Sequence, residues 1–347
     1  MALTIQILPK VLHFKQPART SRGAYTVRKV WYIVLSEGTA AYGYGECAPL
    51  PDLSCDASPH YEQILCDFAE EFSRNNQIEW EKLRAYPSML LGFETAYQQL
   101  QQNSFQLWDT PFSRGEEGIP INGLIWMDSY EQMKKQIEHK LERGFRLIKL
   151  KIGAIDFEEE IDLLQSIRRD YTEKEIQLRV DANGAFSPLE AMSKLERLAK
   201  LDIHSIEQPI KAGQWEEMAA LMKSSPLPIA LDEELIGVND LAEKQRLLEV
   251  IAPHFLVLKP SLHGGFSGCE EWIEEAERRN IGWWITSALE SNLGLNAIAQ
   301  WTATLNSPLP QGLGTGALFK DNVSLPLEIR QSELRFDPKG VKDFCLA

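Results

Sequence analysis

The sequence has no long apolar run and no leader-like beginning. No stretch of about 18 consecutive apolar residues occurs anywhere in its 347 residues. The first residues, MALTIQILPKVLHFK, show no basic segment followed by an apolar core and a small-residue cleavage site. Both absences argue against a membrane-spanning or exported protein, so we expect a cytoplasmic location and no membrane partner.

Cysteine is scarce and is not arranged for disulfides or zinc. The five cysteines are an odd number at irregular spacing, and none forms a CxxC pair. Structural zinc sites usually repeat closely spaced cysteines or histidines. We therefore interpret these residues as reduced thiols with structural roles.

Basic residues are fewer than acidic residues. The chain has 36 lysines and arginines against 50 acidic residues, which gives a formal net charge of −14. Such an excess of negative charge repels nucleic acid and anionic membranes, so neither is expected as a partner. An anionic ligand would need lysines or arginines concentrated in one place.

The order of predicted elements divides the chain into two domains. Residues 1–115 contain strand-like segments such as VRKVWYIVLS and then a helical pattern, which predicts an α+β domain. Residues 116–324 alternate short apolar strands with amphipathic helices, and this alternation predicts a parallel sheet closed into a (β/α) barrel. The tail, residues 325–347, breaks the alternation, and we expect it to return to the first domain.

Two lysines flank a single leucine in the apolar segment LIKLKIG, residues 147–153. Because side chains alternate along a strand, Lys149 and Lys151 share one face, and the apolar residues beside them face the other way. The lysine face is either the solvated side of an edge strand or a site that needs two amines. A barrel strand has no solvated inner face, so the barrel prediction favours a site. Lys259, in FLVLKPS, raises the same question on a later strand.

Carboxylates follow the intervening strands at regular intervals. Asp181, Glu207 and Asp232 are separated from one another by one βα unit each time, at a spacing of 25 to 30 residues that includes Lys151 and Lys259. In a barrel the carboxyl ends of all strands meet at one rim, so these groups should converge on one pocket. Three carboxylates there would repel one another without a cation between them. Oxygen ligands suit Mg²⁺, and ligand type does not distinguish it from Mn²⁺.

Each of these polar residues has a simpler interpretation when it is taken alone. An isolated carboxylate after a strand is usually a helix cap or a solvated loop residue. Glu233 neighbours Asp232, and we expect Asp232 to be the ligand and Glu233 to support it from behind. Asn183 lies two residues beyond Asp181 and can reach the same rim. Arg179, two residues before Asp181, either holds an anionic group or forms a salt bridge deeper in the barrel.

A divalent metal beside a basic lysine indicates proton abstraction from a carbon next to a carboxylate. Loss of that proton builds negative charge on the carboxylate oxygens, where a metal stabilises it. A lysine accepts a proton only when it is neutral, and a neighbouring cation favours the neutral form. Lys149 and the metal would act on Lys151 in this way, with Lys259 across the barrel mouth. Reprotonation of the intermediate would give racemisation, and loss of a β-hydroxyl would give dehydration.

The same motifs resemble a known superfamily. The KLK pair, VDANG, IEQP, LDEE and LKPS, in this order and spacing, resemble the enolase superfamily in its muconate-lactonising subgroup, where a lysine base works with Mg²⁺. The resemblance implies a (β/α)7β barrel of the TIM type with an α+β capping domain. TSRG at 20–23 and GYGECAPLP at 43–51 look like the two capping loops, and SALESNLGL at 287–295 and GLGTG at 312–316 look like the ends of the seventh and eighth strands.

Within the superfamily the resemblance is to the o-succinylbenzoate synthase family of menaquinone biosynthesis. It implies a carbon–oxygen lyase that dehydrates 2-succinyl-6-hydroxy-2,4-cyclohexadiene-1-carboxylate, a small anionic carboxylate, to o-succinylbenzoate. It makes Lys151 the base, with Lys149 beside it, and sets Lys259 against the enediolate. It implies Mg²⁺ ligands and residues near the substrate as follows: Asp181, Glu207 and Asp232 for the metal, and Ser287, Ser291, Gly312 and Gly314 for the substrate.

Two other functions stay open at this point. Dipeptide epimerases and N-acylamino acid racemases share these lysines and ligands, but dipeptide epimerases of this subgroup usually carry an Asp-x-Asp at the eighth strand, where this chain has GLGTG. A more distant alternative is a non-catalytic metal-binding scaffold, because a fold does not guarantee the function of its relatives. The sequence predicts neither an oligomeric state nor a succinyl-binding pocket.

Overall fold

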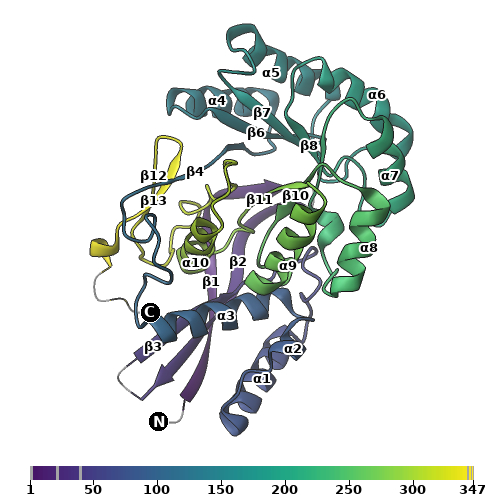
Figure 1. Ribbon diagram of the computed structural model, residues 1–347. Helices are drawn as coiled ribbons and strands as arrows, with labels where there is room; N and C mark the ends of the chain where they lie inside the picture. Colours follow the sequence, from purple (N-terminus) through teal and green to yellow (C-terminus); the bar gives the residue numbers. More distant parts are fainter. Residues whose placement is uncertain (1–2, 21–22, 39–40, 342–343, 345, 347) are drawn as a thin grey trace.

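The computed structural model describes residues 3–20, 23–38, 41–341, 344 and 346 (Figure 1). Over these residues the strands form three sheets. The predicted capping loop TSRG falls partly outside this range, because Ser21 and Arg22 are not among the described residues.

An antiparallel sheet with three helices forms the first part of the chain. Its elements are β1 (Leu3–Thr20), β2 (Gly23–Glu37), β3 (Ala41–Cys47), α1 (Tyr61–Asn75), α2 (Trp80–Leu83) and α3 (Pro87–Gln102). Apolar side chains from the sheet and the helices form one shared core, with Ile33, Leu65 and Phe93 among its buried members. Helix α3 begins at Pro87, where the missing N–H costs no intrahelical hydrogen bond.

Glycine allows α3 to lie directly on β3. A Cβ atom added to Gly45 of β3 would lie 1.8 Å from the backbone oxygen of Gly92 in α3. Carbon and oxygen atoms that are not bonded to each other do not approach so closely. Only glycine at position 45 therefore permits this contact between helix and sheet.

A parallel sheet of seven strands forms the second part. Its strands are hydrogen-bonded in chain order: β5 (Gly123–Ile125), β6 (Leu147–Lys151), β7 (Gln177–Asp181), β8 (Ser205–Glu207), β9 (Ile229–Leu231), β10 (Phe255–Leu258) and β11 (Gly282–Ile285). Helices follow the strands: α4 (Tyr130–Glu142), α5 (Phe157–Asp170), α6 (Pro188–Ala199), α7 (Trp215–Ser224), the short η1 (Glu233–Leu235) with α8 (Leu241–Ile251), α9 (Gly265–Arg278) and α10 (Asn292–Thr304). The predicted alternation of parallel strands and helices is confirmed.

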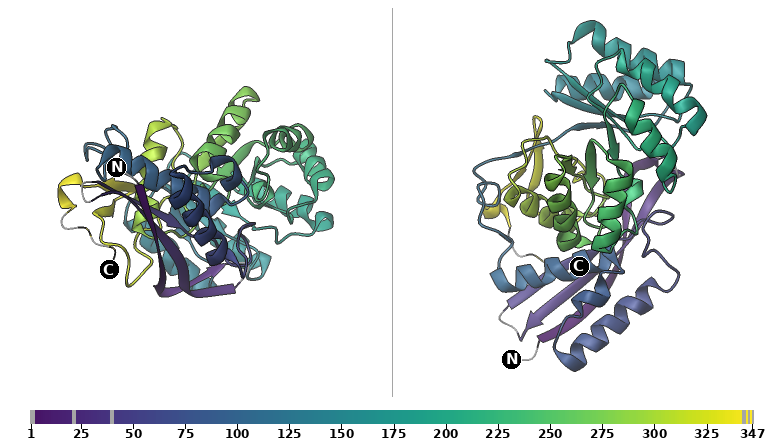
Figure 2. Two further views of the ribbon diagram at one scale, coloured as in Figure 1. Left: turned by 90° about the horizontal axis from the view of Figure 1, so that it is seen from below. Right: turned by 45° about the vertical axis from the view of Figure 1, so that its right-hand side comes forward.

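The sheet is curved, and its two edges approach the same short segment. Helices α5 to α8 lie along the outside of the curve (Figures 1 and 2). Gln311 forms a single parallel bridge to Ile121, just before β5, and Gly312 forms one to Thr286, just after β11. Residues 311 and 312, in the predicted eighth-strand region, therefore connect the first strand of the sheet with the last.

The tail of the chain contacts both parts. Strands β12 (Leu327–Arg330) and β13 (Glu333–Phe336) pair with each other, and β13 pairs with β4 (Ile119–Pro120); the short η2 (Pro338–Gly340) follows. Farther on, the ring of Phe344 lies 4.9 Å from that of Tyr44 in β3 and 4.5 Å from that of Phe105. The proposed domain limits at residues 115 and 325 stay a prediction.

A third apolar cluster joins the antiparallel sheet to the carboxyl ends of the last parallel strands. It includes Leu12 and Tyr32 from β1 and β2, and Leu262, Ala288 and Leu289 from the segments after β10 and β11. This packing places β1 and β2 over the ends of the parallel strands, where the charged residues lie. Among the described helices, none combines the length and the apolar character needed to cross a membrane.

Replacing Gly45 with alanine should destabilise the protein, because the new methyl group overlaps the backbone of Gly92. We expect a loss of about 3 kcal/mol in the free energy of unfolding, measured in urea. The control is Gly213→Ala. A Cβ at Gly213 meets no atom within 4 Å, and only its positive φ of 88° opposes alanine. That control should lose about 1 kcal/mol, and equal losses would contradict the steric explanation.

Candidate functional site

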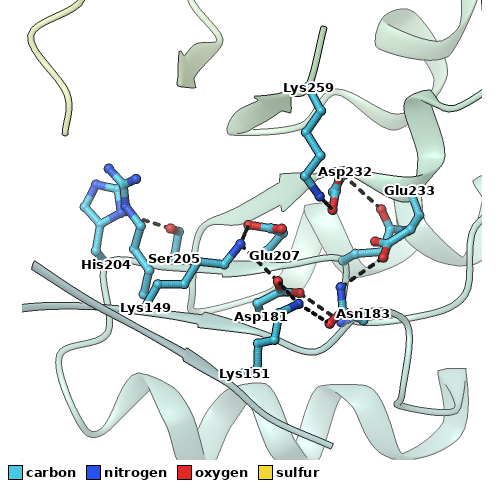
Figure 3. Close-up of polar contacts among 12 residues, drawn as sticks. Lys149, Lys151, Asp181, Asn183, His204, Ser205, Glu207, Asp232, Glu233 and Lys259 are labelled. Atoms are coloured by element: carbon cyan, nitrogen blue, oxygen red, sulfur yellow. Dashed lines mark hydrogen bonds and ion pairs between the residues drawn. The ribbon is translucent and has the colours of Figure 1, made fainter. Parts of the chain in front are cut away.

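Charged side chains from neighbouring strands meet at the carboxyl ends of the parallel sheet (Figure 3). Strand register places Lys151, Asp181 and Glu207 side by side on β6, β7 and β8. Asp232 directly follows β9, and Lys259 directly follows β10. The expected convergence of these residues is therefore observed, because parallel strands bring the ends of successive βα units to one edge.

Lys149 lies between two carboxylates. Its ammonium nitrogen is 3.0 Å from Asp181 Oδ2 and 2.5 Å from Glu207 Oε2. All three side chains are more than nine-tenths buried. An unpaired charge at such depth is strongly unfavourable, so each of these groups depends on the others to remain inside the protein.

Lys151 lies nearer to the open end of the site. It donates to Asp181 Oδ2 at 3.1 Å and to Asn183 Oδ1 at 2.7 Å. The side-chain amide of Asn183 in turn donates to Glu233 Oε1 at 2.9 Å. Asn183 adopts a positive φ of 44°, a conformation that asparagine tolerates better than most residues. It therefore links the amine of Lys151 to the carboxylate of Glu233.

Lys259 approaches the site from the other side, as Figure 3 shows, and its ammonium group forms an ion pair with Asp232. The side chains of Lys259 and Lys151 are 13% and 12% exposed, more than those of Asp232 and Asp181 at 1%. The two amines therefore lie closer to the opening than the carboxylates to which they bind.

The lysines lower the pKa of the three buried carboxyl groups to different extents. At Asp181, burial would raise the pKa, but Lys149, Lys151 and Lys259 outweigh it and hold that pKa below its ordinary value. Burial raises the pKa of Glu207 to about 8, with a further contribution from the charge of Asp181.

The pKa of Asp232 is raised as well, by burial in the first place, against the attraction of Lys259. For Lys149 and Lys259, burial alone would lower the pKa, but the facing carboxylates outweigh it and raise the pKa of both amines. Lys149 and Lys259 are therefore held charged, and the pocket would still accommodate further positive charge beside Glu207 and Asp232.

Two of the three carboxylates, Glu207 and Asp232, have an oxygen atom that could bind a cation, whereas both oxygens of Asp181 accept hydrogen bonds. Glu207 Oε1 and Asp232 Oδ1 are buried, and neither accepts a hydrogen bond from the part of the chain that the structure describes. Within that part, no three histidine, cysteine or acidic side chains already surround one point as ligands do. The ammonium groups of Lys149 and Lys259 lie against these carboxylates instead. The residues fit a hard divalent ion, because their donors are oxygen atoms and two of these atoms have no hydrogen-bond partner among the described residues. Binding would require the ammonium groups of Lys149 and Lys259 to move away from the carboxylates.

A cavity of about 110 Å³ opens above these charges. Nine of the predicted residues line it: Lys149, Lys151, Asp181, Asn183, Glu233, Lys259, Ser287, Gly312 and Gly314. The hydroxyl of Ser287 is hydrogen-bonded to that of Thr315 at 2.5 Å, which connects the segment after β11 to the GLGTG segment. Glu207 and Asp232 lie behind the wall, in contact with the lysines.

Arg179 and Ser291 are not brought to the wall of this cavity. Arg179 shares a register position with Lys149, and its guanidinium carbon lies 3.9 Å above the ring of Trp284, with an N–H donated to the oxygen of Pro310 at 3.3 Å. This places it deeper between the strands than a substrate-contacting residue would be.

Ser291 caps the N-terminus of α10 and contacts the antiparallel sheet rather than the cavity. Its backbone N–H donates to Glu46 Oε1 at 2.8 Å, and its hydroxyl donates to the other oxygen of Glu46. Gly294 N–H donates to Glu46 as well, at 2.9 Å. Strand β3 of the antiparallel sheet is thereby bound to the helix after β11.

Sequence reasoning missed the apolar half of the cavity. Its side chains come from β2, from the segment after β3 and from the first parallel strand and the turn beyond it: Tyr25, Leu50, Leu53, Leu124 and Trp126. Leu50 lies in the predicted loop GYGECAPLP, and Leu53 follows it two residues beyond its end, so both belong to PLPDLS at 49–54. The resemblance had pointed to that loop without identifying which side chains face inward. Alternation cannot identify them, because the segment forms turns instead of a strand.

Gln208, in the IEQP motif, was also missed as an individual residue. Its amide oxygen accepts from the backbone N–H groups of Asp232 and Glu234, each at 3.2 Å. Its amide nitrogen donates to Glu234 Oε2 at 3.0 Å. Gln208 therefore fixes the backbone that carries Asp232.

Comparison with known proteins identifies the relatives of this chain. Residues 132–339 match the family model described as "Enolase C-terminal domain-like". The chain is 43% identical to an o-succinylbenzoate synthase of Desulfotalea psychrophila, with 92% of this chain and 95% of the relative covered. It is 28% identical to an L-Ala-D/L-Glu epimerase of Bacillus subtilis, over 86% of this chain and 82% of the relative.

Solved structures give a consistent result. The crystal structure of MenC from Desulfotalea psychrophila superposes with a TM-score of 0.82 at 38% identity, covering 96% of this chain and 100% of the other. A dipeptide epimerase from Cytophaga hutchinsonii, complexed with Mg and a dipeptide, has the same TM-score at 19% identity, over 97% of this chain and 94% of the other. At that identity the likeness shows a shared fold alone.

Glu46 should make the stability of the protein depend on pH. Burial raises the pKa of this carboxyl from an ordinary 4.5 to about 7. The folded protein therefore keeps a proton that the unfolded chain releases, so the contribution of Glu46 is complete below about pH 4.5 and is lost as the pH rises through 7. Relative to Glu46→Gln, the free energy of unfolding should fall by about 2 to 3 kcal/mol between pH 5 and pH 8.

The measurement is urea unfolding of both proteins across that pH range. Glu217→Gln, which removes an exposed carboxyl, serves as the control and should track the wild type at every pH. A difference between wild type and Glu46→Gln that stays constant from pH 5 to pH 8 would contradict the assignment.

Proposed function

The chain belongs to the enolase superfamily, and we propose that it dehydrates 2-succinyl-6-hydroxy-2,4-cyclohexadiene-1-carboxylate to o-succinylbenzoate in menaquinone biosynthesis. Its family match and its 43% identity to an o-succinylbenzoate synthase make it an enzyme of this superfamily and support a lyase reaction. The observation that carries the proposal is the pair of lysines, Lys151 and Lys259, that line one cavity beside three buried carboxylates.

The fold that we propose is a closed (β/α)7β barrel of the TIM type under an α+β capping domain. The single bridges of Gln311 and Gly312 to the two edges of the parallel sheet support closure. The apolar cluster between β1, β2 and the ends of the last strands supports the capping role of residues 1–115, and the contacts of Phe344 support the return of the tail, residues 325–347.

Lys151 is the base in this proposal. It removes the proton from the ring carbon next to the carboxylate, and its position at the cavity wall supports this role. The hydroxyl on the neighbouring ring carbon then leaves. The products are o-succinylbenzoate and water, so the proton taken by Lys151 balances the hydroxide that departs.

Asp181, Glu207 and Asp232 would hold Mg²⁺, or Mn²⁺ in its place. Such an ion offsets the carboxylate charges and stabilises the negative charge that develops on the substrate carboxylate. Asn183 and Glu233 line the cavity beside these ligands and are hydrogen-bonded to each other. Lys149 keeps Asp181 and Glu207 together at the base of the site.

Lys259 faces the developing enediolate. Its charge, held by Asp232, lies across the cavity from Lys151 and attracts the oxygens on which negative charge builds up.

The apolar side chains of Leu50, Leu53 and Trp126 suit the hydrocarbon ring of the substrate. Ser287, Gly312 and Gly314 line the remaining wall and are the candidates to contact the substrate. A cytoplasmic location accords with this pathway and remains part of the proposal.

Replacing Lys151 with alanine should reduce kcat by about 10²- to 10⁴-fold, because the base is lost while the rest of the cavity remains. The assay measures o-succinylbenzoate formation from the cyclohexadiene substrate in the presence of Mg²⁺. Lys200→Ala, which removes an exposed lysine after α6, should retain wild-type turnover. Unchanged turnover in the Lys151 variant would contradict its role as the base.

Chelation of divalent ions should abolish turnover, and added Mg²⁺ should restore it. The ion should also raise the melting temperature of the wild type, because it binds the folded state alone. This shift should disappear in Asp232→Asn. Turnover that persists in EDTA would contradict the metal site.

The alternative function is a racemase or epimerase with the same lysines and ligands. Exchange of solvent deuterium into N-acylamino acids or dipeptides, without dehydration of the cyclohexadiene, would contradict the proposed lyase and support that alternative.

A further inference from the structure

His263 is a buried histidine that is hydrogen-bonded to the backbone of Lys259, and it has no role in the proposed reaction so far. Its side chain has no exposed surface. It lies four residues after Lys259, in the turn between β10 and α9. Its ring nitrogen Nδ1 accepts a hydrogen bond from the backbone N–H of Lys259 at 2.9 Å.

Both backbone polar groups of Lys259 are bound within this turn. The carbonyl oxygen of Lys259 accepts from the N–H of His263 at 2.9 Å and from that of Leu262 at 2.8 Å. His263 therefore contacts Lys259 twice, through its ring and through its backbone. Since Lys259 lies just past the end of β10, its N–H needs a partner from outside the strand, and the imidazole provides it.

The surroundings of His263 leave little freedom to the ring and its backbone. Gly264, with a φ of 99°, turns the chain into α9. A Cβ atom added to Gly268 would lie 2.8 Å from the carbonyl oxygen of His263. Because Nδ1 of His263 accepts the backbone N–H of Lys259, this ring nitrogen carries no proton.

We propose that His263 is a positioning residue that fixes the backbone of Lys259 and so aims its ammonium group at Asp232 and the cavity. Once both backbone groups of Lys259 are bound, its dihedral angles are restricted and the direction of its Cα–Cβ bond is set. The side chain then reaches the ion pair with Asp232 from one defined origin. The proposal depends on the proposed function only for the catalytic role of Lys259.

Two variants at position 263 separate the hydrogen bond from the volume of the ring. His263→Leu introduces an apolar side chain of similar size and removes the acceptor. His263→Asn places an amide oxygen close to the position of Nδ1 and preserves it. We expect kcat to fall by about 10- to 100-fold in the leucine variant with KM changed less than about threefold, because a small misplacement of Lys259 weakens transition-state binding. The asparagine variant should stay within about threefold of the wild type.

A second measurement is independent of activity. Hydrogen exchange at the Lys259 amide should be at least about tenfold faster in His263→Leu than in the wild type, and unchanged in His263→Asn. The amides of β10, Phe255–Leu258, should exchange at the same rate in all three proteins. Lack of turnover in the wild type would defeat the proposed function alone, since exchange at Lys259 would still decide the role of His263.

Phe266→Leu is the control for general destabilisation. Phe266 is buried in the first turn of α9, where its ring packs against Trp108 and Trp301, and it does not line the cavity. Its variant should lower the melting temperature and leave kcat and exchange at Lys259 unchanged. Equal losses of kcat in Phe266→Leu and His263→Leu, or an asparagine variant as impaired as the leucine variant, would overturn the proposal.

Discussion

The buried contact of Lys149 with Asp181 and Glu207 is the constraint on which the rest of the site depends. Each of these charges would be costly to bury alone, by several kcal/mol. Together they are tolerated, because parallel pairing of β6, β7 and β8 places them in adjacent positions. The pairing also fixes the location of Lys151, two residues farther along the same strand face.

The cavity exists because the antiparallel sheet is bound to the segment after β11. Arg28 of β2 is buried and donates to the carbonyl oxygens of Ala48, just after β3, and Ala288, in the cavity wall. Glu46 of β3 binds Ser291 and Gly294 in the next helix. These contacts hold the apolar half of the cavity over the charged half. A ring bound between them would be shielded from water, which strengthens the electrostatic effect of the lysines.

The two lysines at the cavity wall are supported in different ways. Lys151 is held by the side chains of Asp181, a proposed metal ligand, and of Asn183 beside it. Lys259 is held at its side chain by Asp232 and at its backbone by His263. A group that stabilises developing charge is most effective when its position is fixed in advance. The contacts of Lys259 with Asp232 and His263 fix both its side chain and its backbone.

The sequence by itself determined the parallel βα alternation, the strand ends that carry charge and their order. Apolar periodicity and one charged residue per unit are local signals, so Lys149, Lys151, Asp181, Glu207 and Asp232 could be found without coordinates. The tertiary structure alone decided which neighbours face the cavity. Arg179 shares the strand face of Asp181 and the register position of Lys149, yet its guanidinium stacks on Trp284 and does not line the cavity, because the direction of a long side chain depends on its packing partners. The inward leucines of PLPDLS and the ring of His263 lie in turns, where no period relates sequence to direction, so only packing across the whole chain could place them.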